Sequence, residues 1–350
     1  MGSDSIDVVG LGNALLDMQV RVPDEFLKDH QILKASMQLV DIDFQKTLLS
    51  SLLEKKLPLE ISSGGCVANS LAGISNFGGR AKLVAKLGSD SNAEAYQKDL
   101  KKIGVSFSTA PHDSLSTGTC LAFITPDAER SMLTHLGAAQ ALSPDDILPE
   151  DHEKAKITYL EGYLWDSPSA KAACWKAAEI AKRAGKKVAL TLSDSHCVVR
   201  HFNDFWDFTE KFVDILFCNE SEVKAFSKSH GVEESFLKIK NLCEFIFVSV
   251  GSHGALLSSD FGNLTESIGT WDVPLIDKLG AGDLFAGGVL FGLSNNNSLR
   301  ESGYLGCFAA TKVIQQMSAR LNESLQEQLD EALHGPQKNS TKALELKIRA

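Results

Sequence analysis

The stretch Asp277-Lys278-Leu279-Gly280-Ala281-Gly282-Asp283 runs into an apolar segment, Leu284–Leu293, and this pattern indicates a glycine turn followed by a buried helix. Val273 and Ile276 indicate an extended approach to the turn. Glycines at such a turn let backbone N–H groups point at one centre, and the helix N-terminus adds partial positive charge there. A carboxylate beside such an anion hole suggests a proton acceptor, so Asp283 is a candidate general base. The alternative is a tight turn with Asp283 as a helix cap.

The composition is that of an ordinary globular protein. The 350 residues carry 35 basic and 45 acidic side chains, which gives a formal net charge of −10. This length fits one large α/β domain or a core with a smaller lid. No basic cluster is dense enough to track a phosphate backbone, so we expect no nucleic-acid partner.

The cysteines and the apolar segments predict a cytoplasmic protein. Seven cysteines are scattered without a C-x-x-C pair, which indicates reduced thiols and gives no support for a zinc site. The first residues have neither a basic region nor an apolar signal core. The longest apolar stretch is too short to span a bilayer, so we expect no membrane association.

Short apolar strands alternate with helical segments along most of the chain. This alternation predicts a three-layer α/β/α core with a parallel sheet. The expected strands are 6–11, 81–87, 157–160, 187–192, 215–218 and 245–250, and the expected helices are 44–55, 69–77, 93–103, 170–184, 202–213, 220–227, 284–293, 299–316 and 324–333.

Four further strands, at 18–22, 37–40, 117–124 and 130–135, do not fit the alternation. They predict a small separate β-sheet that acts as a lid. The expected organisation is therefore a core of residues 6–12, 41–110 and 136–334, a lid of residues 13–40 and 111–135, and a polar tail, 335–350.

Two other glycine-containing turns are candidates for binding hydroxyl groups. Gly64-Gly65 precedes Asn69, whose amide is both donor and acceptor; the alternative is a Gly-Gly loop with Asn69 as a cap. Gly10-Leu11-Gly12 follows the first strand but lacks the third glycine of a dinucleotide fingerprint. Asn13 and Asp17 are instead candidates for binding a polyol, because a carboxylate binds hydroxyls strongly; the alternative for Asp17 is a surface carboxylate.

The carboxyl ends of two later strands are candidates for binding a nucleotide, since open α/β sheets bind ligands there. Glu222, close to Asn219, is a candidate ligand for hydrated Mg²⁺, or else part of a helix start with acids in its first turn. Ser249, Gly251 and Gly254 form another strand-to-glycine turn. The chain has no P-loop sequence, so a nucleotide site of that kind is excluded.

Taken in chain order, these segments resemble the ribokinase/PfkB family of carbohydrate kinases, from about Ile6 to Leu321. The Gly64-Gly65 segment with Asn69 is similar to the family's first signature, and residues 277–283 are similar to its second, commonly D-T-x-G-A-G-D. Asn219 with Glu222 resembles the family's N-x-x-E. Within the family, residues 10–17, 117–120 with 130–133, and 213–222 look most like adenosine kinases.

The resemblance implies a ribokinase-like fold and ATP-dependent phosphorylation of a primary hydroxyl, of the 5′-OH type, on a nucleoside or sugar. Adenosine or a related riboside is expected ahead of ribose or fructose. Asp283 would be the base, and the backbone N–H groups of Gly280, Ala281, Gly282 and Asp283 would form the anion hole. The implied acceptor ligands are Asn13, Asp17, Gly64, Gly65, Asn69 and Tyr163, with Arg130 near the transferred phosphate. Asn219 and Glu222 would organise Mg²⁺ and ATP, and Ser249, Gly251 and Gly254 would border the nucleotide. A monovalent cation such as K⁺ near Asp277 is also implied.

Several positions depart from the family pattern. Lys278 and Leu279 replace the usual Thr and an often polar neighbour, and Cys66 replaces a Lys that is common in ribokinases. Tyr163-Leu164 stands where adenosine kinases often have paired aromatics, so we expect reduced stacking on a base. Two other classes stay open: an oxidoreductase built on Gly10-Leu11-Gly12, and a kinase-like sensor without turnover.

Two expectations concern mechanism and assembly. The helix dipole should keep Asp283 ionised, which makes it a weak base that is well placed. Closure of the small sheet should exclude water and limit ATP hydrolysis. An exposed edge of that sheet is compatible with a monomer or a homodimer.

Overall fold

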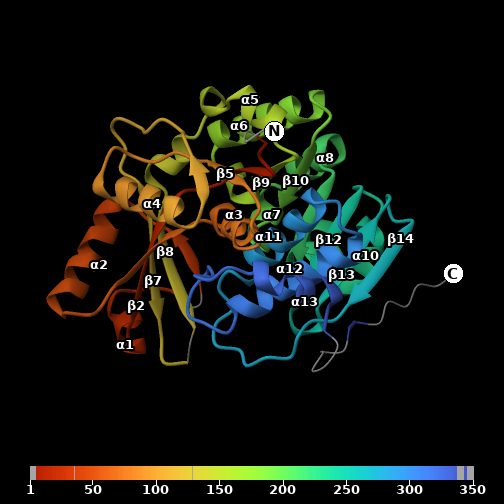
Figure 1. Ribbon diagram of the computed structural model, residues 1–350. Helices are drawn as coiled ribbons and strands as arrows, with labels where there is room; N and C mark the ends of the chain where they lie inside the picture. The colour runs from red at the N-terminus through yellow and green to blue at the C-terminus, as the bar shows by residue number, and fades with distance from the viewer. Residues whose placement is uncertain (1–4, 35, 128, 337–342, 345–350) are drawn as a thin grey trace.

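The computed structural model describes residues 5–34, 36–127, 129–336 and 343–344, and its larger sheet has nine strands in the order β14-β13-β12-β11-β10-β9-β1-β5-β6 (Figure 1). The seven strands from β6 to β12 in this order are parallel, and β13 and β14 add an antiparallel edge. The strands of this sheet are β1 (Val8–Leu11), β5 (Ala81–Val84), β6 (Val105–Phe107), β9 (Ile157–Glu161), β10 (Lys187–Thr191), β11 (Ile215–Asn219), β12 (Phe245–Ser249), β13 (Ala255–Ser259) and β14 (Leu264–Ile268).

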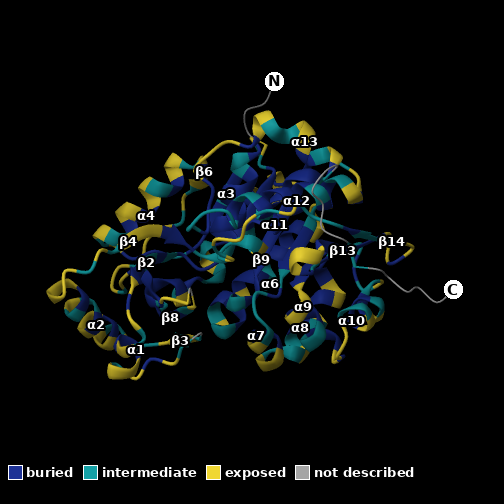
Figure 2. Ribbon diagram, turned by 90° about the horizontal axis from the view of Figure 1, so that it is seen from below, coloured by how far each residue is buried: buried dark blue, intermediate teal, exposed yellow. Residues whose placement is uncertain are grey.

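Helices cover both faces of this sheet, because its central strands are apolar on both sides. One core cluster joins residues of α3, α4, α11 and α12, and a second joins residues of α6, α8, α9 and α10. Figure 2 shows the buried residues concentrated around α3, α11 and α12. The helices of this core are α3 (Cys66–Asn76), α4 (Ser91–Lys102), α5 (Pro149–Lys154), α6 (Pro168–Arg183), α7 (Ser195–Arg200), α8 (Phe202–Phe212), α9 (Glu220–Ser227), α10 (Val232–Ile239), α11 (Ala281–Ser294), α12 (Leu299–Val313) and α13 (Leu329–His334).

The second sheet has five strands in the order β3-β8-β7-β2-β4. Its elements are β2 (Leu15–Arg21), α1 (Asp24–Asp29), β3 (Met37–Leu39), α2 (Ile42–Glu54), β4 (Glu60–Gly64), β7 (Gly118–Ile124) and β8 (Arg130–His135). A third core cluster packs Phe26, Leu48 and Leu52 from the two helices against Leu121 and Phe123 of β7. The predicted fold class, a parallel-sheet α/β core with a small β-sheet lid, is confirmed.

The boundary between the two parts differs from the expected one. Residues 41–110 were assigned to the core, but β4 pairs antiparallel with β2, and α2 packs on the small sheet. The reason is that a short polar segment such as β4 carries no apolar pattern, and only its pairing with β2 reveals it as a strand. The expected polar tail, 335–350, lies largely outside the described residues.

Two other details differ from the sequence expectations. The hairpin β13–β14 was not anticipated, because the strand Ala255–Ser259 follows directly on the glycine turn after β12. The approach to residue 280 contains no strand between 272 and 280; the Ile276 and Asp277 N–H groups instead donate to the Ile314 carbonyl, at 2.8 and 3.1 Å. Within the described part of the chain, no helix combines the length and the apolarity needed to cross a membrane.

Candidate active site

The start of α11 forms a cradle of backbone amides, as its glycines predict. Gly280 precedes the helix with φ at 76°, and a Cβ there would lie 2.3 Å from the Ala319 carbonyl oxygen, so only glycine fits. A Cβ on Gly282 would meet nothing within 4 Å, which leaves an open space above the helix start. The Ala281 N–H donates to the Lys278 carbonyl at 3.2 Å. The Ala281 amide is therefore already paired, and the anion hole expected from four amides rests on the other three.

Asp283 lies in the first turn of α11 and is held by Asn69 of α3. The Asn69 Nδ2 donates to the Asp283 Oδ2 at 2.8 Å. Burial raises the pKa of Asp283 to about 6, against smaller lowering effects of the Asn69 and Cys66 side chains and of Arg320. The expectation that the helix dipole would make Asp283 a weak base is wrong in direction, because desolvation outweighs the local favourable interactions. A carboxylate with this pKa is a stronger proton acceptor near neutral pH.

The carboxylate of Asp17 lies on β2, near enough to Asp283, Arg320 and Arg130 for their charges to influence it. A Cβ on Gly64 would lie 2.2 Å from the Asp17 Oδ2, so glycine there makes room for the carboxylate. Among the described residues, no protein group donates a hydrogen bond to Asp17. Burial raises its pKa to about 7, although Arg320 and Arg130 lower it. An acceptor site without protein donors is suited to the hydroxyls of a ligand.

Gly65 follows β4 directly and lets the chain pass close to the backbone of Asn13. Its φ is 100°, and a Cβ there would lie 2.0 Å from the Asn13 carbonyl oxygen. This close approach brings Asn13, Asp17, Gly64 and Gly65 together, as the sequence predicts.

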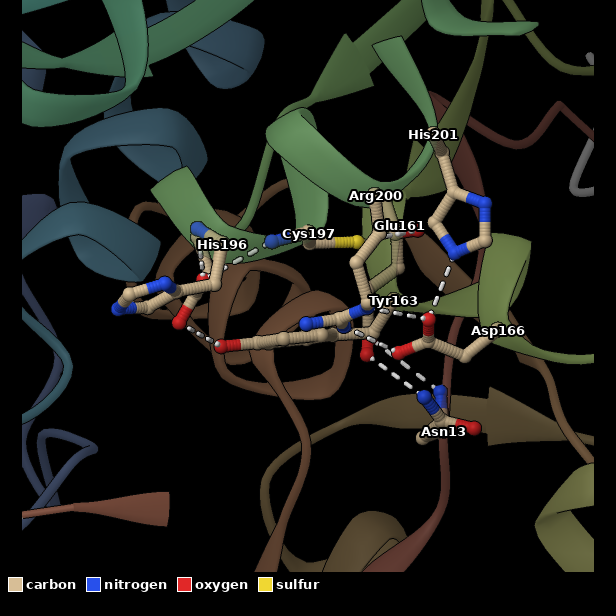
Figure 3. A network of polar contacts seen from close by, with 10 residues as sticks. Asn13, Glu161, Tyr163, Asp166, His196, Cys197, Arg200 and His201 are labelled. Carbon is tan, nitrogen blue, oxygen red and sulfur yellow. Dashed lines mark hydrogen bonds and ion pairs between the residues drawn. The ribbon is translucent and has the colours of Figure 1, made fainter. Parts of the chain in front are cut away.

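Glu161, at the end of β9, was missed by the sequence reasoning. Its carboxylate accepts from the Asn13 Nδ2 at 3.0 Å, from the Asn13 backbone N–H at 3.2 Å and from the Val67 N–H at 3.4 Å. Figure 3 shows Glu161 facing Asn13. Burial raises the pKa of Glu161 to about 7. The Asn13 side chain is thus fixed by the protein, and Glu161 orients it.

Tyr163 lies near this network, but its neighbour Leu164 does not. The Tyr163 hydroxyl donates to the Asp194 Oδ2 at 3.4 Å, and Asp194 caps α7. Leu164 is 1% exposed and belongs to the second core cluster. Of this pair, only Tyr163 remains to contact a base.

Arg130 of β8 forms an ion pair with Asp277, and its Nη1 donates to the Gln19 Oε1 at 3.1 Å. This contact joins the small sheet to the segment before the amide cradle. Asp277 offsets the charge of the guanidinium, and a role of Arg130 toward a transferred phosphate stays a prediction.

A pocket of about 480 Å³ opens at the start of α11. Its lining includes three predicted nucleotide residues, Ser249, Gly251 and Gly254, and also Ala281 and Gly282 from the cradle. The size lies within the usual range for small-molecule sites. Thr270, Trp271, Thr311 and Ile314 also line it and were not predicted, since no local motif marks them.

Asn219 and Glu222 form a capping box at the start of α9. The Asn219 side chain accepts from the Glu222 N–H, and Glu222 accepts from the Asn219 N–H at 3.0 Å and from its Nδ2 at 2.5 Å. Neither residue lines the pocket described above. Burial raises the pKa of Glu222 to about 7, with a contribution from Asp283. The observed contacts of Asn219 and Glu222 are therefore those of a helix start, which was the alternative to a metal site. A role of Glu222 toward Mg²⁺ stays a prediction.

One group of metal-capable side chains, Asp166, Cys197 and His201, occurs among the described residues (Figure 3). Asp166 already accepts from Arg200 at 2.8 Å and from the His201 ring at 2.7 Å. The guanidinium occupies the carboxylate and repels a cation, so these contacts are better explained as an ion-pair network.

Arg320 is a further residue that the sequence reasoning missed. It is 6% exposed, and its Nε donates to the Asn69 Oδ1 at 2.7 Å. It lies in an irregular segment after α12, far from every motif, so no local pattern could have found it.

Comparisons with known proteins agree with this geometry. In a structure of a probable sugar kinase from Rhizobium etli CFN 42, the match has a TM-score of 0.86 and 37% identity, covering 94% of this chain and 98% of that one. The adenosine kinase structure from Sinorhizobium meliloti matches with a TM-score of 0.85 and 36% identity, covering 94% and 99%. Adenosine kinase 2 of Arabidopsis thaliana is 28% identical over 88% of this chain and 94% of its own length.

The family profile described as pfkB family carbohydrate kinase matches residues 39–325. This match spans both signature segments, the Gly-Gly turn before α3 and the turn at the start of α11. The resemblance stated above is confirmed, and with it a phosphotransferase that acts on a hydroxyl group. The chain belongs to the PfkB family of carbohydrate kinases.

Proposed function

We propose that this protein is an ATP-dependent kinase that phosphorylates the 5′-hydroxyl of adenosine or a related riboside. The observation that carries the proposal is the position of Asp283. Its carboxylate lies in the first turn of α11, next to Ala281 and Gly282, which line the nucleotide-sized pocket, and its charge influences Asp17. Phosphoryl transfer needs this kind of positioning and charge neutralisation more than covalent chemistry.

Each part of the site has one task in this scheme. Asp17 accepts hydrogen bonds from the two ribose hydroxyls, while Asn13 and Asn69 contact the sugar, and the glycines at 64 and 65 let it approach the backbone. Asp283 takes the proton of the 5′-hydroxyl as that oxygen attacks the γ-phosphorus of ATP, while the bond from this phosphorus to the bridging oxygen breaks and ADP leaves. The free amides at the start of α11, with Arg130, stabilise the charge on the transferred group. Tyr163 contacts the base.

On the nucleotide side, Ser249, Gly251 and Gly254 border ATP, and Asn219 with Glu222 supports its metal. The Glu222 oxygens keep lone pairs beyond the two bonds from Asn219, which fits a hydrated Mg²⁺ better than a bare ion. Bound Mg²⁺ would neutralise the charge of the phosphates. A K⁺ ion near Asp277 would be a further cofactor.

Adenosine is favoured as acceptor because adenosine kinases are among the relatives with near full-length similarity. A free sugar is the second candidate. It is supported by the burial of Leu164, which leaves Tyr163 as the single aromatic of the pair, and by the similarity to a probable sugar kinase.

A coupled ADP-release assay over adenosine, other ribosides, ribose, fructose and their phosphates tests the proposal. The expected result is that adenosine has the highest kcat/KM, with no ADP release without Mg²⁺. The Asp283→Asn protein serves as the control for acceptor-independent ATP hydrolysis. Ribose or fructose ahead of every nucleoside would contradict the adenosine assignment, and ADP release with no acceptor at all would contradict the kinase function.

Two further expectations concern the protein in the cell. A monomer or homodimer is expected, and light scattering would measure it. The cysteines among the described residues are all free, which is compatible with a reducing cytoplasm.

A further inference from the structure

Arg320 is a buried arginine to which the chemistry proposed above gives no role. Besides the Asn69 amide, its guanidinium contacts the Ser63 hydroxyl and lies 3.5 Å from the Gly64 carbonyl oxygen. It also lies 3.4 Å from Asp99, whose side chain is 36% exposed. Since that ion pair is partly open to water, it contributes little by itself. Most of the donors of Arg320 therefore serve residues of the acceptor cleft.

The guanidinium determines which way the Asn69 amide faces. Arginine only donates hydrogen bonds, so the amide oxygen of Asn69 must face Arg320. The NH₂ group of Asn69 then faces Asp283, to which it donates at 2.8 Å. A reversed amide would place its oxygen against the carboxylate and its NH₂ against the guanidinium, which are two repulsive contacts.

The segment that carries Arg320 also supports the amide cradle. The Ile314 carbonyl accepts from the N–H groups of Ile276 and Asp277, just before the cradle. The Ala319 carbonyl packs against Gly280, where a Cβ would come within 2.3 Å. Residues 314–320 thus contact the cradle through their backbone, and the Arg320 side chain contacts Asn69, which in turn donates to the base.

We propose that Arg320 is a positioning residue for the general base. It holds the Asn69 amide in the orientation that keeps the Asp283 carboxylate beside the cradle. The inference rests on the proposed kinase function and deepens it. In this arrangement Asn69 keeps one N–H and one oxygen lone pair, which remain available for an acceptor hydroxyl.

The test compares Arg320→Met, which keeps the apolar stem without donors, with Asn69→Ala and with the double variant. The expected kcat of Arg320→Met is lower by about 10- to 100-fold, because misplacement of a reacting group by about 1 Å can cost this much. The KM for ATP should not change, since Arg320 is not among the residues that line the nucleotide pocket. Because Arg320 acts chiefly through Asn69, the loss in the double variant should be far smaller than the product of the two single losses.

Three results would overturn the proposal: a wild-type kcat in Arg320→Met, a rise in the KM for ATP with kcat unchanged, or losses that multiply in the double variant. If Arg320→Met does not fold, Arg320→Lys takes its place in the test. One donor suffices to face the Asn69 oxygen, so kcat should stay close to that of the wild type; a loss as large as that of Asn69→Ala would contradict this. Arg300→Met is the matched control, because Arg300 pairs with Glu266 on the surface.

A second readout does not depend on turnover. In the wild-type background, Asp283→Asn should shift the side-chain NH₂ resonances of Asn69, because that group donates to the carboxylate. In the Arg320→Met background the same substitution should leave these resonances in place. An equal shift in both backgrounds would refute the role of Arg320, even if no acceptor were phosphorylated and the proposed function had failed.

Discussion

Replacing Asp283 by asparagine is expected to remove most turnover. The variant is also expected to be more stable than the wild type when the two are compared at the same pH. Burial raises the pKa of Asp283 from its ordinary 3.8 to about 6. The folded state therefore binds its proton more strongly than the unfolded state does. For such a group the stability falls as the pH rises above 3.8, and the loss is complete above about pH 6.

The size of this effect follows from the same values. One pH unit corresponds to about 1.4 kcal/mol, so the ionised carboxylate destabilises the folded protein by at most about 3 kcal/mol. Asp283 is only partly buried, and solvent screening makes this figure an upper bound. An uncharged amide of the same shape avoids that cost and can still accept from Asn69. A functional group that destabilises its own site is common in enzymes.

Two measurements check this prediction. In the ADP-release assay, loss of the base should lower kcat by about 10²- to 10⁴-fold with little change in the acceptor KM. For the wild type, kcat/KM should rise with pH through about 6, and the variant should lack that rise. In thermal unfolding between pH 4 and pH 8, the stability of the variant relative to the wild type should increase with pH.

A near-normal kcat in the variant would refute the base assignment. A stability difference that does not grow with pH would refute the burial argument. A slow variant that is also less stable at every pH would point to a damaged fold in place of a missing base. Asp127→Asn is a suitable control, because Asp127 lies in an exposed turn away from the cleft.

Asp17→Ala should raise the KM for the acceptor far more than the KM for ATP, because Asp17 is proposed to bind the acceptor hydroxyls. Steady-state kinetics with each substrate varied in turn checks this prediction. Equal effects on the two KM values would count against the binding of a diol by Asp17. Glu161→Gln should stabilise the protein increasingly as the pH rises from 4.5 to about 7, since burial raises the pKa of Glu161 over that range. Parallel melting curves of the variant and the wild type at pH 4 to 8 measure this stability difference. A difference that does not depend on pH would disprove the prediction. Gly282→Ala should leave the melting temperature nearly unchanged and raise the KM for ATP, because the added Cβ enters open space at the pocket. Gly280→Ala should instead destabilise the fold, because Gly280 has a left-handed φ and an added Cβ would clash with the Ala319 carbonyl. The reverse ranking of the two variants in thermal unfolding would show that the cradle is built differently.

The charges that surround Asp283 make the site sensitive to pH as a whole. Asp17, Glu161 and Glu222 also have raised pKa values, each near 7, and each is influenced by the charge of Asp283. These carboxyl groups do not titrate independently, so a measured profile reports the cluster and not one residue. Comparison with the Asp283→Asn profile separates the base from its neighbours.

The features that the sequence determined by itself are those with local causes. The turn at 280–283 follows from Gly280, because glycine tolerates both its left-handed φ and the close approach of the Ala319 carbonyl. The alternation of strands and helices follows from the period of apolar residues, and it predicted the parallel sheet and most strands of the lid. The candidate acceptor residues were also recognisable, because each lies in a short segment around a glycine turn.

Only the tertiary structure decided which distant groups meet. Glu161 binds Asn13 across 148 positions, and Arg320 binds Asn69 across 251. The small sheet gained β4 through its pairing with β2, although the sequence of β4 has no strand pattern. The direction of the pKa shift of Asp283 was likewise not predictable. A helix dipole can be predicted from the local sequence, whereas desolvation depends on every segment that packs around the carboxylate.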